Sequence, residues 1–246
     1  MKKFLTLLAI PSLLAAGSSQ LLAAENTTEP KKIWTGSLEL GYTNTSGNTE
    51  ETNTVARAGL DREKDQWRYA IDFDAINSES DGERSAEKYF LSNRLAYAYT
   101  ENNYAFGYAA YDKDRFSGYD YQATLAAGYG RRILNNDTMH WDLEVGPGYR
   151  ISKAEDEATG EDSEELIIRL FTEYAWHFSD NADFTQSLNV ESGSDSTITK
   201  SITALKLQVI GSVAVKLSYT IKYSDNVPTD KRHADTETAV TLAYSF

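Results

Sequence analysis

The stretch Val213-Ala214-Val215-Lys216-Leu217-Ser218-Tyr219-Thr220-Ile221-Lys222-Tyr223 alternates large apolar residues with smaller or polar ones. Val, Leu, Tyr and Ile occupy the odd positions, and Lys, Ser and Thr occupy the even positions from Lys216 onward. Successive side chains of a β-strand point to opposite faces of its sheet. The stretch therefore predicts a strand with one apolar face and one hydrophilic face.

The same period of two recurs along most of the chain, and no convincing amphipathic helix is found after residue 24. Runs of roughly ten residues with this period are typical of half-buried strands. Counting the clear and the weaker runs together predicts about twelve strands. Clear runs lie at residues 34–42, 67–73, 88–99, 119–129, 139–150, 166–178, 213–223 and 237–246, and weaker ones at 51–60, 104–112, 184–193 and 197–210.

The connections between these runs alternate between short and mostly longer segments. Short turns are expected at 61–66, 100–103, 134–138, 179–183 and 211–212, and longer loops at 44–50, 77–84, 113–118, 152–163, 193–197 and 224–235. An even strand count with this alternation is typical of a single antiparallel transmembrane β-barrel. Its short turns face the periplasm and its longer loops face the cell exterior.

Charged residues within the strands fall almost entirely on the face opposite the aromatic residues. A charge facing lipid costs about 2–4 kcal/mol at the bilayer midplane, so these charges are expected to line the barrel interior. Arg57, Arg68, Arg169 and Lys222 belong to this face, on which basic and acidic residues nearly balance. The near balance predicts cross-lumen ion pairs, little ion selectivity and a closed or weakly conducting barrel.

Aromatic residues sort by the length of the neighbouring connection, which is typical of the two aromatic girdles at membrane interfaces. The predicted periplasmic ring contains Trp34, Trp67, Tyr99, Tyr104, Trp141, Trp176, Phe178, Phe184, Tyr244 and Phe246. The predicted outer ring contains Tyr42, Phe73, Tyr108, Tyr119 and Tyr223. Gly146-Pro147-Gly148 interrupts one strand, and because proline cannot donate a ladder hydrogen bond, a bulge or bend is expected there.

The N-terminus predicts export. Lys2 and Lys3 precede an apolar run at residues 4–16, and small residues up to Ala24 complete the pattern of a secretory signal peptide. The expected organisation is a signal peptide at 1–24, a short periplasmic segment at 25–32 and the barrel at 33–246.

Composition excludes several classes of protein. The 13-residue apolar run at 4–16 is too short for a membrane helix, which excludes a helical transporter. The 246-residue chain has no cysteine, so it has neither disulfides nor thiol chemistry. Its net charge of −13 would repel nucleic acid, which is not an expected partner.

The opening motif Trp34-Thr35-Gly36-Ser37-Leu38-Glu39-Leu40-Gly41-Tyr42, followed by Thr45-Ser46-Gly47-Asn48-Thr49, resembles the YdiY-like family of salt-induced outer-membrane proteins. Trp67 in the third strand is also similar. The terminal Ala243-Tyr244-Ser245-Phe246 resembles the C-terminal signal that the barrel-assembly machinery reads. The resemblance covers residues 33–246 and implies a barrel in the bacterial outer membrane. The family has a domain of unknown function, so the resemblance implies no reaction, and the link to salt rests on the family name alone.

No residue pattern predicts a catalytic, cofactor-binding or metal site. A lipase-type site needs a serine beside a histidine, and neither His140 nor His177 has a serine two residues along its own face. Both are expected in a salt-bridged lumen, and His233 in a solvated loop. The acidic segment Glu155 to Glu165 is expected to be solvated, with weak association of divalent cations as a further hypothesis.

We therefore predict a non-enzymatic outer-membrane β-barrel, either a narrow pore or an envelope-stress protein, with no cofactor. Expected partners are outer-membrane lipid, lipopolysaccharide and, through Phe246, the barrel-assembly machinery. Two alternatives stay open at this point. One is a membrane-embedded hydrolase, which would need a lipid-facing Ser–His contact, and the other is a surface-binding protein that uses its extracellular loops.

Overall fold

The computed structural model describes residues 34–46, 51–80, 83–114, 119–154, 162–227 and 231–246, with only the backbone for 43–46, 51–53, 78–80 and 83–86. The predicted signal peptide at 1–24, the predicted periplasmic segment at 25–32 and most of the acidic segment, 155–161, lie outside the described residues. The described ranges contain no helix long and apolar enough to cross a membrane.

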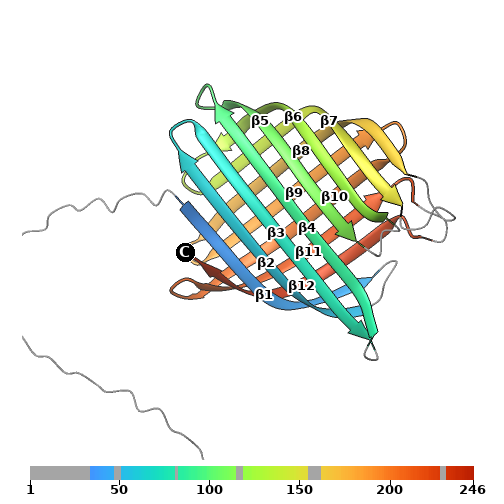
Figure 1. The fold of residues 1–246 in the computed structure, drawn as a ribbon. Helices are drawn as coiled ribbons and strands as arrows, with labels where there is room; N and C mark the ends of the chain where they lie inside the picture. The colour runs from blue at the N-terminus through green and yellow to red at the C-terminus, as the bar shows by residue number, and fades with distance from the viewer. Residues whose placement is uncertain (1–33, 47–50, 81–82, 115–118, 155–161, 228–230) are drawn as a thin grey trace, which may run out of the picture. The chain divides into compact units, whose positions relative to one another are not determined.

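The described chain forms a closed antiparallel barrel of twelve strands, as the sequence pattern predicts (Figure 1). The strands are β1 (Trp34–Ser46), β2 (Glu51–Lys64), β3 (Trp67–Ser80), β4 (Glu83–Ala98), β5 (Asn103–Asp114), β6 (Tyr119–Asn135), β7 (Met139–Ala154), β8 (Ser163–Ser179), β9 (Ala182–Gly193), β10 (Thr197–Ile210), β11 (Val213–Ser224) and β12 (Ala234–Ser245).

Each strand pairs with its neighbours in sequence, and β1 pairs with β12 to close the sheet. At the seam, the backbone N–H of Gly36 donates to the carbonyl oxygen of Phe246, and the N–H of Phe246 donates back to Gly36, both at 3.0 Å. Closure leaves no strand edge with unpaired backbone groups. We call the end of the barrel that holds Trp34, Ser245 and the β2–β3 turn the turn end, and the opposite end the loop end.

The register sorts side chains onto the two faces that the alternation predicts. Glu39 pairs with Arg57 on the inward face, whereas Leu38 pairs with Ala58 on the outward face. Large apolar side chains on outward positions are exposed on every side of the barrel, Leu40, Leu125 and Leu166 among them. A surface of this kind is typical of a barrel that lipid surrounds.

Most of the predicted aromatic girdle residues lie on the outward face. Trp67, Trp141, Trp176 and Tyr244 are exposed near the turn end, and Tyr223 is exposed near the loop end. Neighbouring rings contact each other along the turn end, for example Trp67 and Tyr97 with ring centroids 4.9 Å apart.

The girdle prediction is wrong for three residues, because Tyr104, Tyr108 and Tyr119 point inward. Tyr104 and Tyr108 share their face with Asp112, which lines the lumen, and Tyr104 is buried. The neighbouring strand β6 makes room for these two rings, because β5 pairs its inward aromatic residues with glycine or alanine of β6. A register shift between Tyr119 and Tyr121 pairs Tyr119 with the buried Ala154 and changes its direction.

The strands continue into all six of the predicted long loops, and two of these loops become short as a result. The expected loop at 77–84 is mostly strand, since β3 extends to Ser80 and β4 begins at Glu83. The expected loop at 193–197 shortens to residues 194–196 between β9 and β10. The alternation of short and long connections is thus less strict than the sequence suggests.

Of the bulge or bend expected at Gly146-Pro147-Gly148, the bulge is wrong, and a bend stays a prediction. The pairing of β6 with β7 passes from Ala126 opposite Gly148 to Tyr129 opposite Val145 without a register shift. Pro147 is exposed on the outward face, and the two backbones approach closely beside it. A Cβ atom built on Gly128 would lie 2.6 Å from the Cα atom of Gly146, so only glycine fits there.

We expect Gly128→Ala to lower the free energy of unfolding by about 1–3 kcal/mol, because the added methyl group would push β6 and β7 apart. Gly107→Ala is the matched control, since a Cβ atom on Gly107 would meet nothing within 4 Å. Urea unfolding in lipid vesicles, followed by tryptophan fluorescence, measures both variants. Equal stability of the two variants would contradict the close approach of the strands.

Candidate functional site

The inward side chains make the lumen of the barrel the candidate functional site. Every strand contributes at least one charged residue to this face, and most of these charges form ion pairs with residues on other strands. The pairs gather into four groups at different places along the lumen.

The first group surrounds Glu144 on β7, whose side chain is fully buried. Arg94 of β4 donates through Nε to Glu144 Oε1 at 2.8 Å, and Arg169 of β8 donates through Nη1 to Glu144 Oε2 at 3.1 Å. Arg68 of β3 adds a contact of 3.2 Å to Asp142. Glu144 thus joins an arginine of the neighbouring strand β8 to an arginine of β4, which is not adjacent to β7.

Inward aromatic rings cover these arginines. The Arg169 guanidinium lies 3.9 Å from the ring centre of Tyr108 and 4.9 Å from that of Phe171. Arg68 lies 4.6 Å from the ring centre of Tyr104, and the Tyr104 hydroxyl accepts a hydrogen bond from Arg94. Cation–π contacts of this kind are strengthened where water is excluded. We call these residues, Arg68, Arg94, Arg169, Asp142, Glu144, Tyr104, Phe106, Tyr108 and Phe171, the arginine–aromatic cluster.

The second group lies around the seam of the barrel. Arg57 of β2 contacts Glu237 of β12 at 2.6 Å and Asp74 of β3 at 3.5 Å. Glu39 of β1 accepts from Lys216 of β11 at 2.8 Å. These contacts connect strands across the β1–β12 junction, so they add to the backbone pairing that closes the sheet.

The third group lies at the loop end, where Arg150 is 1% exposed. Its guanidinium pairs with Glu165 and also donates to the carbonyl oxygen of Ser196 at 2.7 Å. The backbone N–H of Asp195 donates to Glu165 at 2.8 Å. Arg150 and Glu165 therefore hold the short β9–β10 connection against the inner wall of the barrel.

The fourth group crosses the lumen. Lys222 of β11 contacts Asp112 of β5 at 2.9 Å, although five strands separate β5 from β11 on each side of the ring. Beside it, Lys88 of β4 contacts Asp114 of β5 at 3.4 Å. Lys200 of β10 reaches the ring of Phe90 on β4, with 4.2 Å to its centre, and β4 and β10 are also opposite strands. Side chains thus span the whole lumen at this depth.

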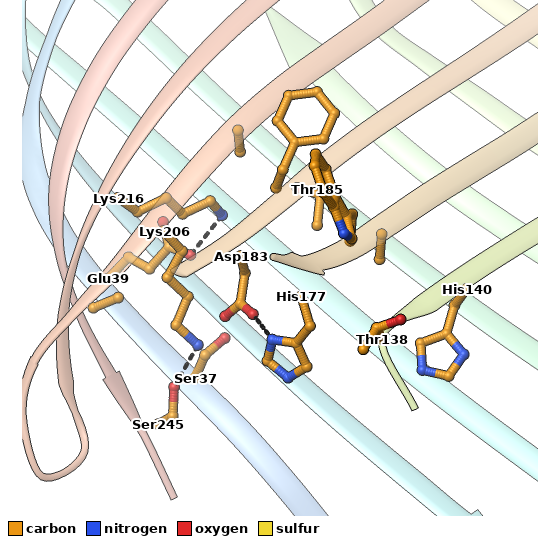
Figure 2. A pocket seen from close by; sticks show the side chains of 15 residues that line it. Ser37, Glu39, Thr138, His140, His177, Asp183, Thr185, Lys206, Lys216 and Ser245 are labelled. Carbon is orange, nitrogen blue, oxygen red and sulfur yellow. Dashed lines mark hydrogen bonds and ion pairs between the residues drawn. The ribbon is translucent and has the colours of Figure 1, made fainter. Parts of the chain in front are cut away.

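The turn end is more open. A cavity of about 490 Å³ opens there, lined on one side by His140 and His177 and on another by Lys206 and Lys216 (Figure 2). Lys206 donates to the hydroxyl of Ser245 at 3.3 Å, and His177 pairs with Asp183. We call this cavity the vestibule. Lys216 and Glu39 of the second ion-pair group are part of its lining.

His177 and His233 lie in the surroundings that the sequence predicts, whereas the partner of His140 is an amide in place of the expected charged residue. His140 and His177 face the vestibule, where the partner of His140 is Asn135 at 2.7 Å and the partner of His177 is Asp183. His233 lies in the exposed β11–β12 connection and contacts the carbonyl oxygen of Ser224. Within the described ranges, none of these rings contacts a serine hydroxyl.

The described part of the acidic segment is occupied by protein partners. Asp162 pairs with Lys153, Glu164 accepts from the Tyr149 hydroxyl at 2.5 Å, and Glu165 pairs with Arg150. In the part of the chain that the structure covers, no group of three or more His, Asp or Glu residues is placed to hold a metal ion. Weak association of divalent cations therefore stays a prediction about residues 155–161.

A closed antiparallel barrel with an apolar outer face and a charged lumen defines a transmembrane β-barrel. Among solved structures, the NanC porin is similar at 10% sequence identity, with a TM-score of 0.57 over 84% of this chain and 98% of that one. The KdgM porin in complex with disordered oligogalacturonate is 9% identical, with a TM-score of 0.49 over 85% of this chain and 99% of that one.

A model of the family described as "Protein of unknown function, DUF481" matches residues 38–246. The chain is also 32% identical to the uncharacterized protein YdiY of Escherichia coli (strain K12) over 233 residues, which are 94% of this chain and 91% of that protein. The chain belongs to the DUF481 family, which confirms the resemblance seen in its opening motif.

Reasoning from sequence missed the arginine–aromatic cluster, because it placed Tyr104 and Tyr108 in the girdles. A signal for their true direction was present. Asp112 and Asp114 stand at even positions of the same strand, so every even position of β5 must face the lumen. The charged residues indicate direction more reliably than the aromatic ones, because aromatic rings are stable both in lipid and in a packed lumen.

We expect Glu144→Ala to lower the free energy of unfolding by about 3–5 kcal/mol, because it leaves Arg169 buried without a carboxylate and removes the nearer of the two carboxylates that Arg94 contacts. The control is Glu173→Ala, since Glu173 faces the same lumen but has no ion pair within the described chain. The Glu173→Ala variant should lower the free energy of unfolding by less than about 0.5 kcal/mol. Urea unfolding in vesicles compares the two, and a similar loss in both would refute a special role for Glu144.

Proposed function

We propose that the chain is a non-enzymatic β-barrel of the bacterial outer membrane that forms a narrow, mostly closed pore. The contact between Lys222 and Asp112 carries this proposal, because it joins opposite walls of the barrel. A barrel of eight strands has an interior that side chains fill, whereas barrels of sixteen to eighteen strands leave an aqueous channel. Twelve strands lie between these cases, so the side chains decide whether the lumen is open.

The groups of ion pairs obstruct the lumen in succession. A solute that enters the vestibule meets the arginine–aromatic cluster on one wall and the Arg57 group on the seam. It then meets the crossing contacts of Lys222 and Lys200, and finally the β9–β10 connection held by Arg150. Removing one partner of a buried ion pair costs about 3–5 kcal/mol, so these side chains do not separate readily.

The pairing of opposite charges also supports weak ion selectivity. Arg57, Arg94, Arg150 and Arg169 each contact at least one carboxylate at short range. A charge that is neutralised by its neighbour exerts little field on a passing ion. Any current through the barrel should therefore be small and should discriminate poorly between anions and cations.

The surface of the barrel supports placement in the outer membrane, with lipid and lipopolysaccharide as its surroundings. Exposed Trp, Tyr and Phe side chains near the turn end would meet the periplasmic interface. Phe246 presents its ring on the outward face beside Tyr244, with centroids 6.2 Å apart. This position supports the proposal that the barrel-assembly machinery reads Phe246.

The surroundings of the histidines support a non-enzymatic role. A hydrolase acting on membrane lipid needs its nucleophile and base at the lipid face, whereas His140 and His177 face the vestibule. Asn135 and Asp183 are their partners in the described chain. The response to salt that the family name implies stays a prediction about expression.

We expect wild-type barrels in planar bilayers to give small and intermittent currents. The double variant Asp112→Ala/Lys222→Ala removes both members of this crossing ion pair together, so its single-channel conductance should rise several-fold.

The matched control is Lys153→Ala/Asp162→Ala, which removes the same two charge types from an exposed pair at the loop end. It should leave the conductance unchanged. Large steady currents through the wild type would overturn the proposal of a mostly closed pore. No increase in the crossing variant would show that Lys222 and Asp112 do not obstruct the lumen.

A further inference from the structure

The loop-end half of β10 reverses the usual distribution of side chains in the barrel. Thr199, Ser201 and Thr203 occupy three successive outward positions, whereas Ile198 and Ile202 face the lumen. The inward contact of Lys200 with Phe90 fixes this assignment, because Lys200 has the same parity as the two isoleucines. Polar side chains here face the bilayer where the other strands present mainly apolar ones.

Gln186 of β9 extends this polar surface. The Thr203 hydroxyl donates to Gln186 Oε1 at 2.5 Å, and Gln186 Nε2 donates to the Ser201 hydroxyl oxygen at 2.9 Å. We call Gln186, Thr199, Ser201 and Thr203 the β9–β10 polar patch. Because three of its members are hydrogen-bonded across two strands, the patch is an ordered surface of the barrel wall.

The patch lies at the depth of the lipid hydrocarbon. Thr199, at its loop-end limit, pairs in register with Tyr223 of the outer aromatic ring. Gln186 is two residues along β9 from Phe184, which pairs with Trp176 of the ring at the turn end. Gln186, Ser201 and Thr203 therefore lie between the two rings, below the reach of lipid head groups.

Acyl chains cannot satisfy this patch. The hydroxyl hydrogen of Ser201 has no acceptor in the described part of the chain, and an unsatisfied polar group in hydrocarbon is costly. Two isolated outward polar residues on other strands have an aromatic partner instead. Asn93 contacts the Tyr69 hydroxyl at 2.6 Å, and Thr172 accepts from Trp141 Nε1 at 2.8 Å.

We propose that the β9–β10 polar patch is the contact surface between two copies of this chain in the membrane. Hydroxyl and amide groups both donate and accept hydrogen bonds, so the patch can pair with itself across a twofold axis. A surface with charges of one sign would repel its own copy. Twofold dimers with self-complementary interfaces are the commonest oligomers. Leu188 and Ile221, in register with Ser201, supply apolar packing around the hydrogen bonds.

The chain has no cysteine, so a single introduced thiol reports on its own surroundings. We expect Ser201→Cys to cross-link into a dimer of twice the chain mass when native membranes are treated with a short bismaleimide. Ser→Cys changes the volume little, so the variant should fold. Leu91→Cys is the control, because Leu91 is exposed on the outward face of β4, opposite β10.

Equal cross-linking of Ser201→Cys and Leu91→Cys, or none in either, would overturn the proposed interface. A product whose mass is not twice that of the chain would overturn the assignment of the partner to a second copy. The triple variant Gln186→Leu/Ser201→Val/Thr203→Val gives an independent measure. The wild type in mild detergent should be dimeric by light scattering and the triple variant monomeric, with unchanged heat-modifiable mobility as evidence of folding. A triple variant that folds and stays dimeric would also overturn the proposal.

Discussion

The structure depends on one constraint, which is that a backbone N–H or C=O group inside a bilayer must find its partner within the protein. The pairing of β1 with β12 satisfies this constraint for the first and the last strand, and the two backbone hydrogen bonds between Gly36 and Phe246 complete it. Closure also separates an outside that lipid solvates from an inside that it cannot reach. The charges that the strands carry at the depth of the hydrocarbon must then be accommodated inside.

The lumen accommodates these charges by pairing them across strands. Glu144 joins Arg94 and Arg169, Arg57 joins both sides of the seam, and Lys222 reaches Asp112 on the opposite wall. Buried ion pairs contribute little net stability compared with apolar packing, but they are costly to break. If the barrel is the mostly closed pore that we propose, these pairs act mainly as obstacles of defined shape in a polar lumen.

The strand order, the closure of the barrel and the direction of most side chains could be predicted from periodicity and loop lengths. Prediction failed where two requirements compete for one residue. Tyr104 and Tyr108 fit a girdle by their type, but their parity with Asp112 places them in the lumen. Pro147 suggests a bulge, yet its outward position and the glycines beside it let the strands continue in register. The end of β3 also extends further than the turn residues indicate.

The sequence by itself determined which face of most strands is apolar, because a period of two allows only one assignment once the charges are placed. It also determined the family, through the motif that begins at Trp34. Only the tertiary structure decided which charges meet, because the contact between Lys222 and Asp112 depends on barrel circumference and stagger, which no local pattern encodes. The β9–β10 polar patch likewise has meaning only once the register places Ser201 on the outward face between the two aromatic rings.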